Sequence, residues 1–221
     1  MRSRLLAILF LTLALAASGS AATINFSNTG TITIPASGTA ASDIVVSGFS
    51  GGITNVTVIL DGLSATALGD IKVLLVGPAG ENFILMSDAS GDHEAFDINL
   101  QFSDAGLPLP ANGFVASGTF QPGDFDPQDD SLSDPAPAGT STLFRAFEGT
   151  DPNGTWSLDI DNAGQDLASL NGGWTLTITA DASGSVTQPP SAATPEPSSL
   201  LLLGTGILGI AGAAKRRVAH S

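Results

Sequence analysis

The sequence predicts an all-β fold, a β-sandwich of the jelly-roll type, for residues 23–182. Short segments in which apolar and polar residues alternate follow one another at close spacing, as half-buried strands do. Gly, Asn, Asp and Pro separate these segments, and the 221-residue chain contains 26 Gly and 13 Pro. No stretch between residues 23 and 180 shows the 3.6-residue period of a helix. Two packed sheets are the usual arrangement for such a chain.

Five segments carry the strand pattern. Apolar and polar side chains alternate in residues 96–102, 55–60, 156–161 and 174–178, which predicts four strands with one buried face. In the segment 96–102 the side chain of Phe96 is expected on the buried side. Residues 71–76 are apolar on both faces, which predicts a strand in the middle of a sheet.

Turn signals place these strands relative to one another. Gly77–Gly80 contains Pro and two Gly, and predicts a tight hairpin after the strand 71–76. Residues 151–154 and 171–173 predict turns directly before the strands that contain Trp156 and Trp174. Residues 120–143 are rich in Pro and Asp without periodicity, and predict a long surface loop.

The charge distribution excludes several classes of function. Between residues 22 and 194 the chain has 20 acidic residues against Lys72 and Arg145, a net charge near −18. Such a surface repels nucleic acid and anionic lipid, so binding to nucleic acid is excluded. The chain contains no Cys, which excludes disulfides, thiol catalysis and a lipoprotein anchor on an N-terminal Cys.

The N-terminal residues 1–22 have the features of a secretory signal peptide. Arg2 and Arg4 precede the apolar stretch Leu5–Ala17, and small residues occupy positions 20–22. We expect signal peptidase to cut after Ala21 or Ala22. The alternative, an N-terminal membrane anchor, is disfavoured because the apolar run is short and a cleavage site follows it.

The C-terminal region predicts a membrane segment. A linker rich in Pro and Ala spans residues 183–194, and the apolar residues 198–214 follow. These 17 residues reach about 26 Å as a helix, enough to cross the hydrocarbon core. The basic residues 215–217 are expected in the cytoplasm, so the body lies on the periplasmic side.

This region, residues 195–221, resembles the PEP-CTERM sorting signal of exopolysaccharide-producing Gram-negative bacteria. The resemblance rests on the triplet Pro195, Glu196 and Pro197, the Leu- and Gly-rich apolar run, and the terminal Arg216 and Arg217. It implies cutting near the triplet by an exosortase-like membrane protease, and then a place at the cell surface or outside the cell. A plain tail anchor, the alternative, leaves the triplet unexplained.

Three further motifs resemble the P domain, also called homo B domain, of proprotein convertases and bacterial subtilisin-like proteases. They are Gly69-Asp70 with the turn Gly77–Gly80, the segment Phe147–Leu158, and the final strand Leu170–Leu176. The resemblance covers about residues 24–179 and implies a jelly roll of eight strands. Ala65–Leu68 depart from the pattern, because aromatic and His residues often stand there in the family.

The residues do not supply an obvious catalytic site. A serine protease triad needs a His beside the nucleophile, and the body has only His93, which lies in a loop-like segment. No cluster of His, aromatic and carboxylate residues marks a glycosidase cleft. We therefore expect that this chain is not an enzyme, although the P-domain resemblance associates it with serine-type endopeptidases and proteolysis.

Calcium is the one cofactor that the sequence suggests. Residues 159–166 begin like a calcium loop, but Ala163 stands at a ligand position and no Glu closes the pattern. Other acidic residues could converge at one end of the sandwich if the P-domain topology holds. The candidate ligands are Asp70, Asp104, Asp159 and Asp161. The alternative is that these acidic loops are simply solvated.

Three hypotheses for function remain open. The first is an exported, non-catalytic surface or matrix module that binds a partner or stabilises structure among exopolysaccharides. The second is an accessory domain that docks on a separate protease. The third is a carbohydrate-binding module, which is weakened because only Trp156 and Trp174 are candidate stacking rings and both sit at core-like positions.

Overall fold

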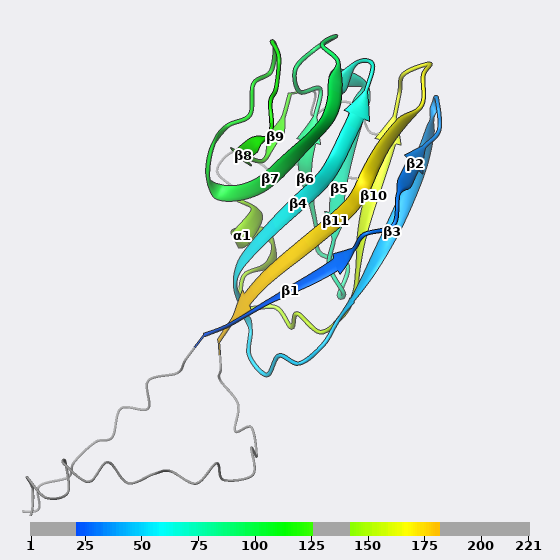
Figure 1. Cartoon of the computed structure of the whole chain (residues 1–221). Coiled ribbons are helices and arrows are strands. Elements are labelled where there is room, and N and C mark those ends of the chain that lie inside the picture. The colour runs from blue at the N-terminus through cyan, green and yellow to red at the C-terminus, as the bar shows by residue number, and fades with distance from the viewer. Residues whose placement is uncertain (1–20, 126–141, 182–221) are drawn as a thin grey trace, which may run out of the picture. The chain divides into compact units, whose positions relative to one another are not determined.

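The computed structural model describes residues 21–125 and 142–181, which form a β-sandwich (Figure 1). These residues belong to the first of two compact units, Met1–Gly184, and the second unit, Ser185–Ser221, lies outside the described residues. The predicted linker, the sorting tail and the membrane helix 198–214 therefore also lie outside them. So does the signal peptide, except for its last two residues. No helix in the described part is long and apolar enough to span a membrane.

The two layers of the sandwich are a six-stranded and a five-stranded sheet. The six-stranded sheet has the order β1-β11-β4-β7-β8, with β2 also paired to β11, and its strands are β1 (Ala22–Asn28), β2 (Ile32–Ile34), β4 (Ile53–Ala65), β7 (Ala95–Pro108), β8 (Gly118–Gln121) and β11 (Ala168–Ala180). The five-stranded sheet has the order β3-β10-β5-β6-β9, and its strands are β3 (Gly38–Val46), β5 (Ile71–Val76), β6 (Asn82–Ser87), β9 (Gly123–Asp124) and β10 (Gly154–Asn162).

The predicted all-β sandwich is confirmed. Of the eleven strands in the described part, β2, β8 and β9 have four residues or fewer, which leaves eight longer strands. Neighbouring strands are antiparallel except for the pairs β6 with β9 and β7 with β8. A 3-10 turn, Leu68–Asp70, precedes β5, and one short helix, α1 (Leu143–Phe147), precedes β10.

Most of the predicted strands and turns are found where the sequence places them. The strand 71–76 is β5, which lies inside its sheet between β10 and β6. Gly77–Gly80 joins β5 to β6, and residues 151–154 lead into β10. The predicted loop 120–143 begins differently, because β8 extends into it and β9 pairs with the end of β6.

Two local predictions are wrong, and backbone conformation explains both. Residues 171–173 are no turn before a strand but a bulge inside β11, where the pairing with β4 shifts between Leu170 and Gly173. The side chain of Phe96, expected on the buried side of its strand, is 85% exposed. Its neighbour Asp97 has a φ of 52°, in the left-handed region, so the alternation that holds from Ile98 onward does not extend back to Phe96.

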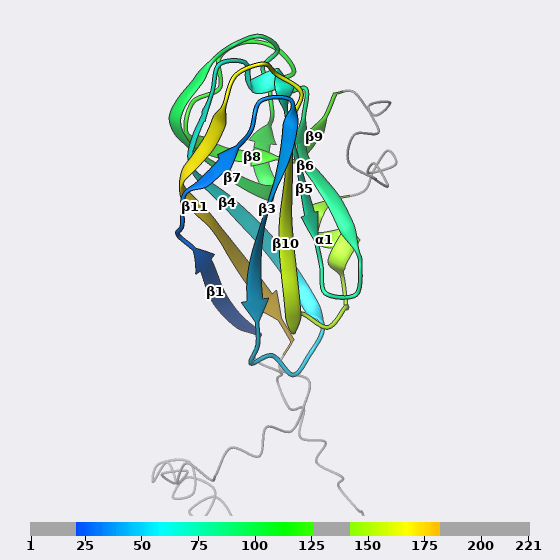
Figure 2. The same ribbon diagram turned by 90° about the vertical axis from the view of Figure 1, so that its right-hand side faces the viewer.

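The core lies between the two sheets and follows the alternation of the strands. Figure 2 shows the sandwich from its edge, with β3 running beside β1 and β2. The largest side chains that are fully buried include Trp156 on β10, Trp174 on β11 and Phe102 on β7. Such a core needs no disulfide, which agrees with the lack of Cys.

Candidate binding surfaces

The two tryptophans of the sequence motifs serve the core. Trp156 is buried, its Nε1 donates a hydrogen bond of 2.9 Å to the carbonyl oxygen of Pro152, and its ring centroid lies 4.9 Å from that of Phe147. Trp174 is also buried, and its Nε1 donates to Ser42 Oγ across the sandwich at 3.0 Å. Neither ring presents a face to solvent, so neither can stack on a sugar.

His93 lies in a loop, where its ring contacts a backbone carbonyl oxygen and an aromatic ring. Its Nδ1 lies 2.7 Å from the carbonyl oxygen of Ser90, and its ring packs edge-on against Phe114 with centroids 4.5 Å apart. The hydroxyl of Ser90 donates to the carbonyl oxygen of Gly113 instead. These contacts fasten the loop before β7 to the loop before β8.

The four proposed calcium ligands do not converge on one point. Asp104, on β7, accepts hydrogen bonds from the backbone N–H groups of Leu143 and Phe144 at 2.9 and 3.0 Å, so it caps the N-terminus of α1. Asp70 ends the 3-10 turn directly before β5, which belongs to the other sheet. Among residues 21–125 and 142–181, no group of three or more His, Asp or Glu side chains is placed to hold a metal ion.

Asp159 and Asp161 lie together on the outer face of the five-stranded sheet. They alternate with the buried Leu158 and Ile160 along β10. Asp43 on β3 joins them, because the register places it opposite Ser157 and hence diagonal to Asp159. The outer face next to β3 therefore carries three carboxylates.

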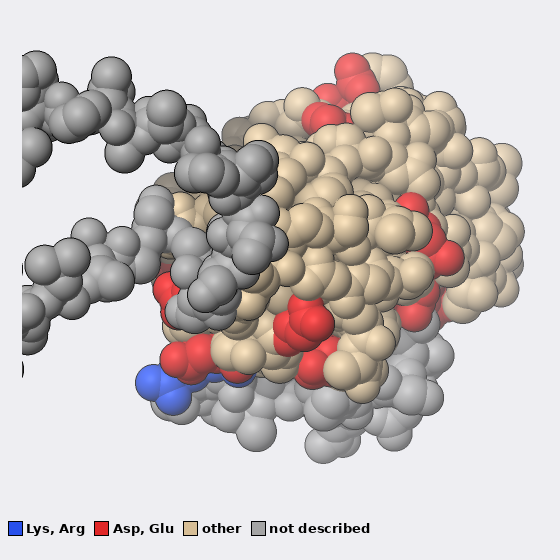
Figure 3. All heavy atoms as spheres, turned by 90° about the horizontal axis from the view of Figure 1, so that it is seen from below, with Lys and Arg blue, Asp and Glu red and all other residues tan. Residues whose placement is uncertain are grey.

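Acidic side chains are also spread over the end of the sandwich where β1 begins and β11 ends. Figure 3 looks onto this end and shows separate acidic groups on a mostly uncharged surface. The described residues contain only two basic side chains, of which Lys72 is buried and Arg145 is exposed. The surface of the described body therefore has little positive charge to offset its acidic residues.

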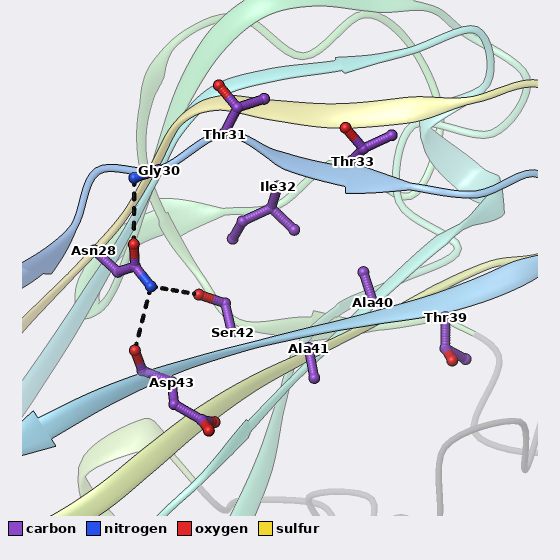
Figure 4. A pocket seen from close by; sticks show the side chains of 10 residues that line it. All are labelled: Asn28, Gly30, Thr31, Ile32, Thr33, Thr39, Ala40, Ala41, Ser42 and Asp43. Atoms are coloured by element: carbon purple, nitrogen blue, oxygen red, sulfur yellow. Dashed lines mark hydrogen bonds between the residues drawn. The ribbon is translucent and has the colours of Figure 1, made fainter.

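A groove runs between the open edges of the two sheets. One hollow of about 670 Å³ is lined by Asn28, by Gly30–Thr33 and by Thr39–Asp43 of β3 (Figure 4). A second, of about 400 Å³, shares Asn28, Gly30 and Asp43 with the first and continues to Val45. The groove thus follows β3 along most of its length. Its walls are mainly Thr, Ser, Ala and Gly.

Asn28 bridges the groove at its middle. Its Nδ2 donates to Ser42 Oγ at 3.0 Å and to the carbonyl oxygen of Asp43 at 3.3 Å, as Figure 4 shows. Its Oδ1 accepts from the backbone N–H of Gly30 at 3.2 Å. One amide therefore links the end of β1 to the edge strand of the opposite sheet.

The outer face of the six-stranded sheet is uncharged over three rows that cross its strands. Thr57, at the centre, lies opposite Thr177 of β11, which lies opposite Asn25 of β1. We call these rows the hydroxyl face, and its members are Thr23, Asn25, Ser27, Asn55, Thr57, Ile59, Gln101, Thr119, Thr175, Thr177 and Thr179. Hydroxyl pairs bond across it, Thr23 with Thr179 at 2.8 Å and Ser27 with Thr175 at 2.9 Å.

Comparison with known proteins identifies the tail. Residues 193–217 match the family model of the PEP-CTERM protein-sorting motif. The chain carries a PEP-CTERM sorting motif. The prediction made from Pro195, Glu196 and Pro197 is thus confirmed, and the motif implies an exported protein that is anchored in the membrane before an exosortase processes it.

The likeness found for the body is much more distant. No curated protein matches the chain. Among solved structures the chain is similar to the serine protease of Aeromonas sobria and to the complex of that protease with its chaperone. Both matches have 14% identity and a TM-score of 0.40, and cover 76% and 73% of this chain. The chain spans only 28% and 27% of those structures, and so distant a likeness carries no argument about activity.

Proposed function

We propose that this protein is an exported, non-catalytic binding or structural module of the cell envelope, delivered by an exosortase-type system. It works at the cell surface or in the extracellular matrix, among exopolysaccharides. The observation that carries the proposal is the sorting motif at residues 193–217, attached to a β-sandwich whose six-stranded sheet presents an uncharged hydroxyl face.

The hydroxyl face suits a neutral polysaccharide. Its Thr and Ser hydroxyls both donate and accept hydrogen bonds, as do the hydroxyls of a sugar chain. An anionic polymer would be repelled by the body, whose net charge is near −18. A neutral polymer meets no such repulsion. Its contact with the uncharged rows would bury no carboxylate, so the cost of removing a charge from water does not arise.

Replacing the triplet tests delivery. In the native host, a chain with Pro195→Ala, Glu196→Ala and Pro197→Ala should stay in the inner membrane fraction at full length. The unchanged chain should appear as a shorter form in the surface or culture fraction. Pro189→Ala with Pro190→Ala is the matched control in the linker, and should be sorted normally. Equal surface delivery of the triplet variant would contradict the proposal.

The second candidate function is an accessory domain for a separate protease, and the P-domain-like motifs support it. Two of these motifs correspond to single structural units of the sandwich. Gly77–Gly80 forms the turn between β5 and β6, and Phe147–Leu158 runs from the end of α1 into β10. Affinity capture from the host envelope distinguishes the two candidates. Recovery of a subtilisin-like protease favours docking, whereas recovery of polysaccharide without a protease favours the surface module.

A further inference from the structure

The edge of β3 leaves backbone groups open toward the groove, although one of them, the carbonyl oxygen of Asp43, already accepts a hydrogen bond from Asn28 and keeps one lone pair. Among the described strands, β3 pairs only with β10, over nine residues without a shift in register. In an antiparallel strand the N–H and C=O of one residue point to the same side, and successive residues alternate. The hydrogen bond from Asn28 to the carbonyl oxygen of Asp43 shows that Asp43 points outward. By alternation, Thr39, Ala41 and Val45 also point away from β10.

Apart from the Asn28 contact and the charge of Asp43, this edge lacks the usual protections against strand addition. Exposed edges are commonly blocked by Lys, Pro, a bulge or an inward-pointing charge. β3 has the sequence Gly-Thr-Ala-Ala-Ser-Asp-Ile-Val-Val, with none of these devices. Its only charged side chain, that of Asp43, is exposed on the outer face, and Val45 on the same face is 72% exposed.

The surroundings of the edge define what an added strand would meet. On the outer face its side chains would lie beside Asp43 and Val45, with Asp159 one strand further in. On the groove side they would meet the small residues Ala40 and Ser42 and the hydroxyls of the opposite wall. Directly opposed side chains of a sheet lie 4.5–5.5 Å apart, close enough for a basic group to pair with Asp43.

We propose that β3 binds an extended segment of a partner polypeptide, which adds an antiparallel strand to the five-stranded sheet. The segment carries Lys or Arg opposite Asp43, an apolar residue opposite Val45, and small side chains toward the groove. Main-chain hydrogen bonds supply the attachment and these side chains supply the selectivity. The inference rests on the proposed function in one respect, that the body acts by binding.

A second copy of this chain fits the edge less well. If β3 paired antiparallel with its own copy about Ser42, Asp43 would face Ala41 and no basic group would meet either carboxylate. Two bodies each near −18 would also repel each other. Charge therefore favours a basic segment of a different protein.

Disulfide capture tests the proposal, because the natural chain has no Cys. The full chain with Ala41→Cys, in detergent and a glutathione buffer, is mixed with the synthetic peptide Thr-Val-Thr-Lys-Thr-Cys-Thr-Thr-Gly. In the proposed register its Val faces Val45, its Lys faces Asp43 and its Cys faces residue 41. A second peptide carries Glu in place of Lys. A third is N-methylated at Lys, which removes one main-chain donor.

Intact-mass spectrometry measures the fraction of chain bound to each peptide. We expect about fivefold more capture of the Lys peptide than of the Glu peptide, since opposite charges on neighbouring strands attract and like charges directly opposite repel. N-methylation should lower capture as well. Adding Asp43→Asn to Ala41→Cys should bring the Lys-to-Glu ratio close to one. Thr57→Cys, on a strand paired on both sides, is the control. Its capture of the peptides should depend little on their sequence or on N-methylation.

Equal capture of the Lys and Glu peptides at Ala41→Cys would overturn the proposal. The proposal would also be overturned if the peptide substitutions changed capture at Thr57→Cys as much as at Ala41→Cys. Covalent dimers of the Ala41→Cys chain that exclude the peptide would overturn it too, because a second copy would then occupy the edge. These results are independent of the sorting test, which follows residues 195–197 in cells. Failure of capture and failure of the proposed delivery are therefore distinguishable.

Discussion

The indole Nε1 of Trp174 donates a hydrogen bond to Ser42 Oγ at 3.0 Å, which joins the two sheets through the core. Trp174 belongs to β11 of the six-stranded sheet and Ser42 to β3 of the other. The same hydroxyl oxygen accepts from Nδ2 of Asn28 at 3.0 Å. Ser42 thus satisfies a buried indole and also fixes the amide that bridges the groove.

Ser42→Ala should destabilise the sandwich. The substitution leaves the indole N–H of Trp174 buried without its acceptor, which costs about 1–3 kcal/mol. For a body of this size, the midpoint of thermal unfolding should fall by roughly 2–4 °C per kcal/mol. Near-ultraviolet circular dichroism of the full chain in detergent measures it. Thr39→Ala, on the exposed face of the same strand, is the control and should stay within about 0.5 kcal/mol of the natural chain.

Gly173→Ala should be far more damaging than another Gly→Ala change at positive φ. Gly173 has a φ of 73°, and a Cβ there would overlap the carbonyl oxygen of Asn28. Gly80 has a φ of 94° but nothing within 4 Å of such a Cβ, so Gly80→Ala costs only the backbone strain of about 1–2 kcal/mol. In urea unfolding, the free energy of unfolding should fall much further for Gly173→Ala than for Gly80→Ala. Similar midpoints for the two variants would show that β1 moves aside easily.

The sequence predicts the strands better than it predicts the edges. Alternation at residues 156–161 and the turn Gly77–Gly80 are local properties, and both are found as expected. The groove depends on which strand edges remain unpaired, and the sequence of β3 gives no local sign that β10 is its only partner in the described part of the chain. The sequence does not reveal the bulge at residues 171–173, because Asn-Gly-Gly suits a turn equally well. Only the pairing with β4 decides between them.

Asp104 shows that the role of a candidate metal ligand also depends on contacts that are distant in the sequence. A carboxylate in an acidic sequence looks like a ligand, but here it caps a helix 39 residues away along the chain. Asp104→Ala should cost about 1 kcal/mol, as lost N-caps typically do. Asp104→Asn keeps one acceptor and should lose less. Urea unfolding of both variants measures the difference, and equal stability of Asp104→Ala and the natural chain would rule out the capping role.

Calcium binding by Asp159 and Asp161 stays a prediction, and removal of the metal tests it. An ion present at 100 times its dissociation constant would stabilise the folded chain by about 2.7 kcal/mol. Adding a chelator should then lower the unfolding midpoint by roughly 5–10 °C. Asp161→Asn should abolish this response, whereas Asp104→Asn should keep it. If the chelator left the unfolding midpoint of the natural chain unchanged, the calcium prediction would be wrong.

The hydroxyl face offers the sharpest test of the proposed surface role. Thr57→Glu with Thr177→Glu places two opposed carboxylates in the middle of that face. If the face binds a neutral polysaccharide, co-sedimentation of the full chain with insoluble neutral glucan should fall about tenfold, since each buried, unpaired charge opposes contact. Thr39→Glu, on the other sheet, should bind as the natural chain does. Like charges directly opposite each other also weaken the sheet, so the thermal unfolding midpoint of the double variant is measured as a control. The binding result counts only if this midpoint stays close to that of the natural chain. Undiminished binding by a folded double variant would exclude this face.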